Sequence, residues 1–223
     1  EFEKRAKSKG KYDNLIPKFN ELYTKNQEYS LVRDYYSEAP QRNIELLRIM
    51  GGLRNVVITY EKSGEYEYQK MRDKVLKTLE EFYKDYSADI DKEIFVSLMD
   101  LTRKNLNSKY LPTSIIGKDL QVLGDNIYKY SNFTSIEKTK AILNDLSPKE
   151  AVAKIKMDPA YELGNEWNEI IKTNVNPMFE KNKRQIDSLQ QLYMKAQMEL
   201  FPEKKFFPDA NSNRKEWYKY KMN

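Results

Sequence analysis

Side chains that could carry out catalysis are scarce in this sequence. The 223 residues include neither cysteine nor histidine, which removes thiol nucleophiles, imidazole acid–base catalysis and thiolate zinc sites. Carboxylates remain, and the pairs Glu80-Glu81 and Asp89-Asp91 are the first to consider. Residues one or two positions apart do not face each other on a helix, so neither pair can act on one ligand. The sequence therefore predicts no catalytic, metal-binding or cofactor-binding residue.

Three other motifs have both a functional and a structural interpretation. Gly51-Gly52 could belong to a phosphate loop, but no lysine-serine or lysine-threonine follows and no strand precedes. Close approach of a neighbouring helix is the better explanation. Asn132-Phe133-Thr134 fits a glycosylation acceptor, but it also fits a helix start. Several tyrosines could line a substrate-facing surface, although contacts between helices are favoured: Tyr29, Tyr35, Tyr36, Tyr66, Tyr68, Tyr83 and Tyr86.

The charge pattern argues against a nucleic-acid partner. The net charge is +5, from 39 Lys and Arg against 34 Asp and Glu, and the two signs alternate along most of the chain. Basic residues predominate only near residues 4–11, around residues 181–184 and in the last ten residues. A nucleic-acid-binding protein gathers its basic residues on one face, so a solvated surface is the favoured interpretation.

Composition points to long helices. With 7 Gly and 8 Pro, turns are few, and no alternating runs typical of strands occur. No apolar run approaches the roughly 20 residues that cross a bilayer. The first residues lack an initiator methionine and an apolar signal region, so we expect the chain to be cut from something longer or processed.

Apolar periodicity predicts the helices. They should cover residues 12–36, 41–61, 65–86, a helix starting near 89, 117–130 and 159–201. The first should stop at Pro40, because the residue before proline disfavours the α conformation. Gly64 should separate the second from the third, and Asn176-Pro177 should kink the last. In the helix that starts near residue 89, one apolar face is expected to consist of Ile90, Ile94, Leu98 and Leu101.

Short motifs mark further helix starts. Thr134 and Glu137 have the spacing of a capping box, Ser147 and Glu150 repeat it around a proline, and Asp158-Pro159 opens another helix. In the last helix an apolar seam recurs every seven residues, and packing against helices of the same chain is favoured over a free coiled coil. It consists of Phe179, Ile186, Tyr193 and Leu200.

The expected fold is all-α: an elongated multi-helix bundle over residues 1–201, an extended segment over 202–212 and a basic, aromatic tail over 213–223 predicted to be disordered. Stacking of single-stranded nucleic acid on that tail is a weaker alternative.

The most specific stretch runs from Asp187 to Ser212. In it a long helix carrying Tyr193-Met194-Lys195-Ala196 leads into Phe207-Pro208-Asp209-Ala210-Asn211. This stretch resembles the bacterial serine dipeptidyl-peptidases of the dipeptidyl-peptidase 7 and 11 type, and the resemblance extends from Glu1. After Ser212 it is lost, because the family continues into a strand that this chain lacks.

The resemblance implies a helical cap domain inserted into a chymotrypsin-like double β-barrel. In such enzymes the cap restricts cleavage to dipeptides released from a peptide N-terminus. The catalytic His and Asp precede this region and the nucleophilic Ser follows it, so none can be placed here. The chain is thus expected to be inactive alone, with the β-barrels and a peptide as partners. The resemblance also implies a periplasmic or cell-surface parent enzyme that forms a homodimer. A free-standing helical protein–protein interaction module remains the alternative.

Overall fold

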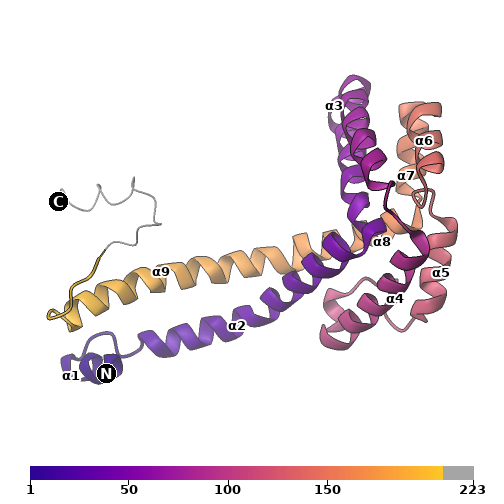
Figure 1. Ribbon diagram of the computed structural model, residues 1–223. Coiled ribbons are helices and arrows are strands. Elements are labelled where there is room, and N and C mark those ends of the chain that lie inside the picture. Colours follow the sequence, from indigo (N-terminus) through magenta and orange to yellow (C-terminus); the bar gives the residue numbers. More distant parts are fainter. Residues whose placement is uncertain (208–223) are drawn as a thin grey trace. The chain divides into compact units, whose positions relative to one another are not determined.

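The computed structural model describes residues 1–207, and these form helices joined by turns (Figure 1). The predicted all-α class is confirmed. The described residues divide into two compact units, 26–181 and 1–25 with 182–207, and each is described by itself. Two helices, α2 (Leu15–Tyr36) and α9 (Asn176–Leu200), contribute to both units.

The unit of residues 26–181 contains most of the hydrophobic core. Its complete helices are α3 (Glu45–Phe82), α4 (Ala88–Asn105), α5 (Leu120–Tyr130), α6 (Ile136–Asp145), α7 (Pro148–Lys156) and α8 (Pro159–Ile170). The largest fully buried side chains, each less than 2% exposed, include Trp167, Tyr68, Phe95 and Phe133. Aromatic side chains of this size contribute much of the apolar area that stabilises the fold.

Helix α3 is a hairpin of two helical segments. Gly64 has φ 77° and ψ −168°, a non-helical conformation that costs little only for glycine. The two segments then run back along each other, as Figure 1 shows, and the rings of Tyr60 and Tyr68 lie 5.8 Å apart. A Cβ on Gly52 would lie 3.5 Å from Val75, whereas Gly51 faces open space. The predicted break at Gly64 is confirmed, and the close helix approach holds for Gly52 alone.

Two π-helical segments interrupt the α-helices. The first α-helix ends at Tyr36, as predicted, but Pro40 does not stop the helical path: the chain continues as the π-helical η1 (Ser37–Asn43) and becomes extended only at Ile44. The amide of Ile44 donates to the carbonyl of Ala39, 3.0 Å away and five residues earlier. A wider turn reduces the clash of a proline ring with the preceding turn. The interruption predicted near Pro177 appears as the π-helical η3 (Ile171–Val175) directly before α9.

Three of the four residues on the predicted apolar face of α4 are exposed, and only Leu98 packs against the core. Ile90 and Leu101 are 63% and 49% exposed, whereas the buried residues of the helix are Asp91, Phe95, Met99 and Thr102. Helix α5 covers this second stripe, where Gly124 allows close contact: a Cβ there would lie 3.1 Å from Val96. The helix has two candidate stripes, and tertiary packing rather than apolar periodicity decides which is buried.

The predicted helix starts are confirmed at two of three positions. Ser147 and Glu150 form the capping box of α7, and Asp158 accepts from the amide of Ala160 at the start of α8. At α6 the N-cap is Ser135, which accepts from Lys138, so the prediction of Thr134 is wrong by one residue. The hydroxyl of Thr134 instead donates to the carbonyl of Ser131, 3.3 Å away. Helix α5 starts at Leu120 rather than at residue 117, with Asp119 as its N-cap.

The second unit joins both ends of the described chain. Helix α1 (Phe2–Lys9) lies here with the first part of α2 and the last part of α9. Within this unit the seam of α9 packs on α2, as predicted: the rings of Phe19 and Tyr193 meet edge to face at 5.9 Å. Residues 201–207 follow without helix. The motif at residues 208–211 and the basic tail lie outside the described residues.

Candidate functional site

The carboxylate pairs considered from the sequence take part in structure. Glu80 pairs with Lys140 at 2.7 Å and Glu81 with Lys84 at 2.6 Å. Asp89 is exposed, whereas Asp91 is buried. Within residues 1–207, no group of three or more acidic, histidine or cysteine side chains is arranged to hold a metal ion.

Asp91 connects three helices through its carboxylate. It is 1% exposed and accepts from the backbone amides of Glu45 and Leu46, at 2.7 and 2.8 Å, at the start of α3. The hydroxyl of Tyr128 on α5 donates to it at 2.7 Å, and that of Tyr86 at 3.4 Å. A carboxylate at a helix N-terminus satisfies amides that have no partner within the helix and complements the helix dipole. The residue at the N-cap position of α3 is Ile44, whose side chain cannot accept a hydrogen bond. Asp91, which lies on another helix, therefore takes over the capping of α3.

Asp158 has the same kind of role at α8. It is 1% exposed and accepts from the hydroxyl of Ser131 at 2.9 Å and from the amides of Asn132 and Ala160 at 2.7 and 3.0 Å. It thereby fixes the turn between α5 and α6 onto the start of α8. These bonds also show Asn132, the first residue of the glycosylation-like motif, as part of that turn.

The tyrosines mostly join helices, as the favoured interpretation expected, and their exposure differs widely. Tyr68 is 1% exposed and lies in the core, whereas Tyr66 is 69% exposed. The hydroxyl of Tyr83 donates to the carbonyl of Phe133 at 2.9 Å, and burial raises the pKa of Tyr83 to about 12. Burial, together with the charge of Asp91, also raises the pKa values of Tyr86 and Tyr128.

Ionisation of Tyr83 is expected to weaken the fold at high pH. Its folded-state pKa of about 12 exceeds the unfolded value of about 10, so the folded chain holds this proton more tightly. The contribution of protonated Tyr83 to the free energy of unfolding is complete below pH ~10, and it falls by about 2 kcal/mol as the pH rises to ~12. Urea unfolding at several alkaline pH values should show a smaller decline for Tyr83→Phe than for Tyr66→Phe. Equal declines in the two variants would contradict this.

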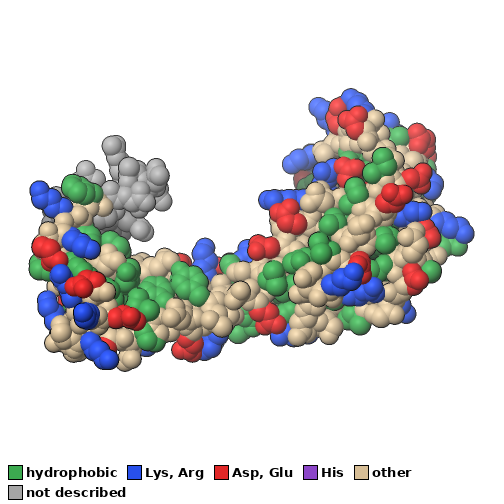
Figure 2. Space-filling model, turned by 60° about the horizontal axis from the view of Figure 1, so that its bottom comes forward, with side chains coloured by type: hydrophobic (Ala, Val, Ile, Leu, Met, Phe, Trp, Pro, Cys, Tyr) green, Lys and Arg blue, Asp and Glu red, His purple; other side chains and the backbone are tan. Residues whose placement is uncertain are grey.

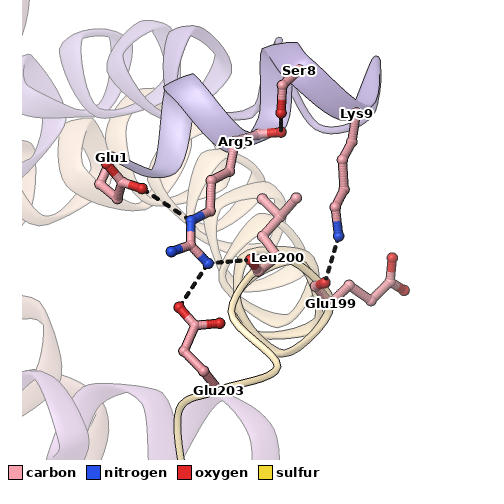
Figure 3. A network of polar contacts seen from close by, with 7 residues as sticks. All are labelled: Glu1, Arg5, Ser8, Lys9, Glu199, Leu200 and Glu203. Atoms are coloured by element: carbon pink, nitrogen blue, oxygen red, sulfur yellow. Dashed lines mark hydrogen bonds and ion pairs between the residues drawn. The ribbon is translucent and has the colours of Figure 1, made fainter.

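Arg5 organises the end of the second unit (Figure 3). Its guanidinium bonds the carboxylates of Glu1 and Glu203, at 3.0 and 2.7 Å, and donates to the carbonyl of Leu200 at 2.9 Å. The ammonium of Lys9 donates to the carbonyl of Glu199 at 3.3 Å. Cations next to the last carbonyls of a helix satisfy unpaired acceptors and complement its dipole. Helix α1 thus supplies a C-terminal cap for α9.

This network also holds two distant parts of the sequence together. Glu1 and Glu203 are 202 positions apart and bind the same guanidinium. Beneath it, Ala6, Leu200 and Phe201 are buried in a small cluster of their own. Residues that enter and leave the helices therefore lie next to each other.

The visible surface carries charges of both signs. In Figure 2 the basic and acidic side chains are interspersed over the described part of the chain, without a large region of one sign. Many are paired, as with Lys92 and Asp125 at 2.8 Å. The interpretation of the net charge as a solvated surface agrees with this view.

None of the described helices has the length and hydropathy needed to cross a membrane.

The described residues are helical, and the buried carboxylates of Asp91 and Asp158 hold helices together. The chain belongs to the peptidase S46 family, whose model matches residues 1–215. That match ends close to Ser212, where the resemblance was expected to end.

Three curated relatives are similar to this chain. The Asp/Glu-specific dipeptidyl-peptidase of Flavobacterium psychrophilum is 29% identical over 98% of the chain and 31% of its own length. The one from Capnocytophaga gingivalis is 32% identical over 96% of the chain and 30% of its own length. Dipeptidyl-peptidase 7 of Porphyromonas gingivalis is 24% identical over 61% of the chain and 20% of its own length. The chain therefore spans less than a third of each relative, and the predicted resemblance is confirmed.

Proposed function

We propose that this chain forms the helical cap domain of a serine dipeptidyl-peptidase. A domain inserted into another fold needs its entry and exit close together, and Arg5 binds Glu1 and Glu203 at one point. That observation carries the proposal. The absence of histidine and cysteine from the sequence fits a domain that shapes access and leaves peptide cleavage to other residues.

The role of such a cap is steric. Helices standing over a cleft would exclude the middle of a folded chain and admit a peptide N-terminus, so that dipeptides are released. Its partners would be a double β-barrel, which supplies the catalytic triad, and an extended peptide. Interfaces between domains of one chain are modest in area, so movement of the cap during substrate entry is expected. The parent enzyme is proposed to act in the periplasm or at the cell surface.

Complementation tests this proposal. In the Capnocytophaga gingivalis relative, the segment matching this chain would be replaced by a short glycine-serine linker. The linker enzyme and this chain would be assayed alone and mixed, using dipeptide-linked chromogenic substrates and a longer peptide. We expect no cleavage by the chain alone, and dipeptide release that is restored or increased only in the mixture.

A matched variant makes the assay specific. Arg5→Gln removes the ionic contact with Glu203 and should weaken complementation, while the helical circular dichroism signal stays unchanged. Arg72→Gln, an exchange of the same kind on α3, should complement normally. Cleavage by the pure chain, or identical products with and without it, would refute the proposal.

The exposed stripe of α4 favours one alternative, a free-standing interaction module. Ile90, Ile94 and Leu101 recur on one face of the helix and are 63%, 37% and 49% exposed. Contiguous exposed apolar side chains commonly mark interaction surfaces. Co-purification with an unrelated protein, together with failure of complementation, would favour this alternative.

A further inference from the structure

Two clefts meet at one arginine in the unit of residues 26–181. The first, about 570 Å³, lies between α3, α7 and α8, and the second, about 430 Å³, lies between the end of α2, η1, α3 and α8. Arg54 and Asn168 line both. Pockets for small ligands commonly have volumes of roughly 300–1,000 Å³, so each cleft can hold more than a single ion.

Two of the four cations that line the first cleft are paired with neighbouring carboxylates. Lys156 pairs with Glu61 at 2.9 Å, and Lys172 with Glu169 at 3.4 Å. These two glutamates are the acidic side chains that line the cleft. Both carboxylates are therefore already engaged with lysines.

Arg54 differs from those lysines. Its guanidinium donates to the carbonyl of Gly164 at 2.9 Å, and it forms no ion pair with any residue in the described range 1–207. Lys62, on the next turn but one of α3, also lines the first cleft and has no ion-pair partner within that range. A partly buried cation without a counter-charge attracts an anion more strongly than an exposed one, because water screens it less.

The groups next to Arg54 are suited to an oxygen-rich ligand with an apolar part. The amide oxygen of Asn168 accepts from the hydroxyl of Tyr36 at 3.2 Å, which leaves its two N–H donors for another partner. Ile58, which is 37% exposed, adds apolar surface to the same wall.

We propose that the first cleft, between α3, α7 and α8, binds an acidic peptide, with a carboxylate of the peptide placed on Arg54. The planar fork of a guanidinium matches the two oxygens of a carboxylate. Ile58 provides an apolar contact that a peptide can use and an inorganic anion cannot. Lys62 adds attraction at the rim of the cleft. The site is separate from the Arg5 network and needs no catalytic residue.

Titrations of the full chain, followed by two-dimensional proton–nitrogen NMR, test the proposal directly. The probes are a blocked tripeptide with a central glutamate, the same tripeptide with glutamine, and inorganic phosphate. We expect the glutamate peptide to shift the side-chain amide signals of Asn168 and the Nε–H signal of Arg54. The glutamine peptide should bind about tenfold more weakly.

Variants separate a specific site from general attraction. Arg54→Gln should weaken the glutamate peptide at least about tenfold, and Lys62→Gln should weaken it less. Arg72→Gln provides the matched control: it removes an arginine of α3 that is paired with Asp73 at 2.6 Å and lines neither cleft, and should leave binding unchanged.

Three results would overturn the proposal. The first is equal affinity of the chain for both tripeptides, and the second is phosphate binding as tightly as the glutamate peptide. The third is an Arg54→Gln variant that keeps its helical circular dichroism spectrum and binds the glutamate peptide as tightly as the unchanged chain. Because no cleavage is measured, failure here leaves the cap-domain proposal untouched. Failed complementation likewise leaves this site untouched.

Discussion

Replacing Asp91 with alanine is expected to lower the free energy of unfolding by about 3–5 kcal/mol. The carboxylate is 1% exposed and accepts from two backbone amides at the start of α3 and from the hydroxyls of Tyr128 and Tyr86. Without it these donors stay buried and unpaired, and each costs about 1–3 kcal/mol. Urea unfolding followed by circular dichroism at neutral pH measures the loss.

Two companion variants establish the cause. Asp91→Asn keeps one acceptor oxygen and should lose less stability than alanine. Asp89→Ala changes an exposed carboxylate in the same first turn of α4, so it should cost less than about 1 kcal/mol. Similar losses at positions 89 and 91 would mean that the bonds to α3 do not stabilise the fold.

The second large effect is expected at Phe95. This side chain is 0% exposed, lies against Gly124 and meets the ring of Tyr128 edge to face at 6.0 Å. Phe95→Ala should lower the free energy of unfolding by about 3–5 kcal/mol, because it removes buried apolar surface and leaves a cavity. Thermal and urea unfolding of the purified variant would measure the loss.

The adjacent residue is the natural control. Ile94 belongs to the apolar face predicted from the sequence, yet it is 37% exposed. Ile94→Ala should therefore cost less than about 1 kcal/mol. If Ile94→Ala proved the more damaging exchange, the face predicted from periodicity would be the buried one after all.

Local signals predicted most helix positions well. The capping box at Ser147, the Asp158 start and the break at Gly64 each involve residues a few positions apart, and all three appear in the structure. At Pro40 the local signal misleads, because a π-helical segment carries the chain past the proline to Asn43. On α4 a distant partner decides, because α5 covers the stripe that contains Phe95.

The candidate sites were less predictable than the helices. Asp91 looks no different from Asp89 in the sequence, and nothing near it indicates that its partners are Glu45 and Tyr128, 46 and 37 positions away. Nothing in the sequence sets Arg54 apart, because an arginine on a charged helix is ordinary until its neighbours are known. Arg5 is one of several cations in a basic N-terminal stretch.

The sequence by itself determined the all-helical class, the starts of several helices and the lack of imidazole and thiol chemistry, because these depend on residue types and on spacings of a few residues. Only the tertiary structure decided which stripe of α4 is buried, which carboxylates cap distant helices and that Arg54 lines a cleft without an ion-pair partner among residues 1–207. Burial and pairing depend on side chains that folding brings together from far apart in the chain, and local periodicity carries no record of those partners.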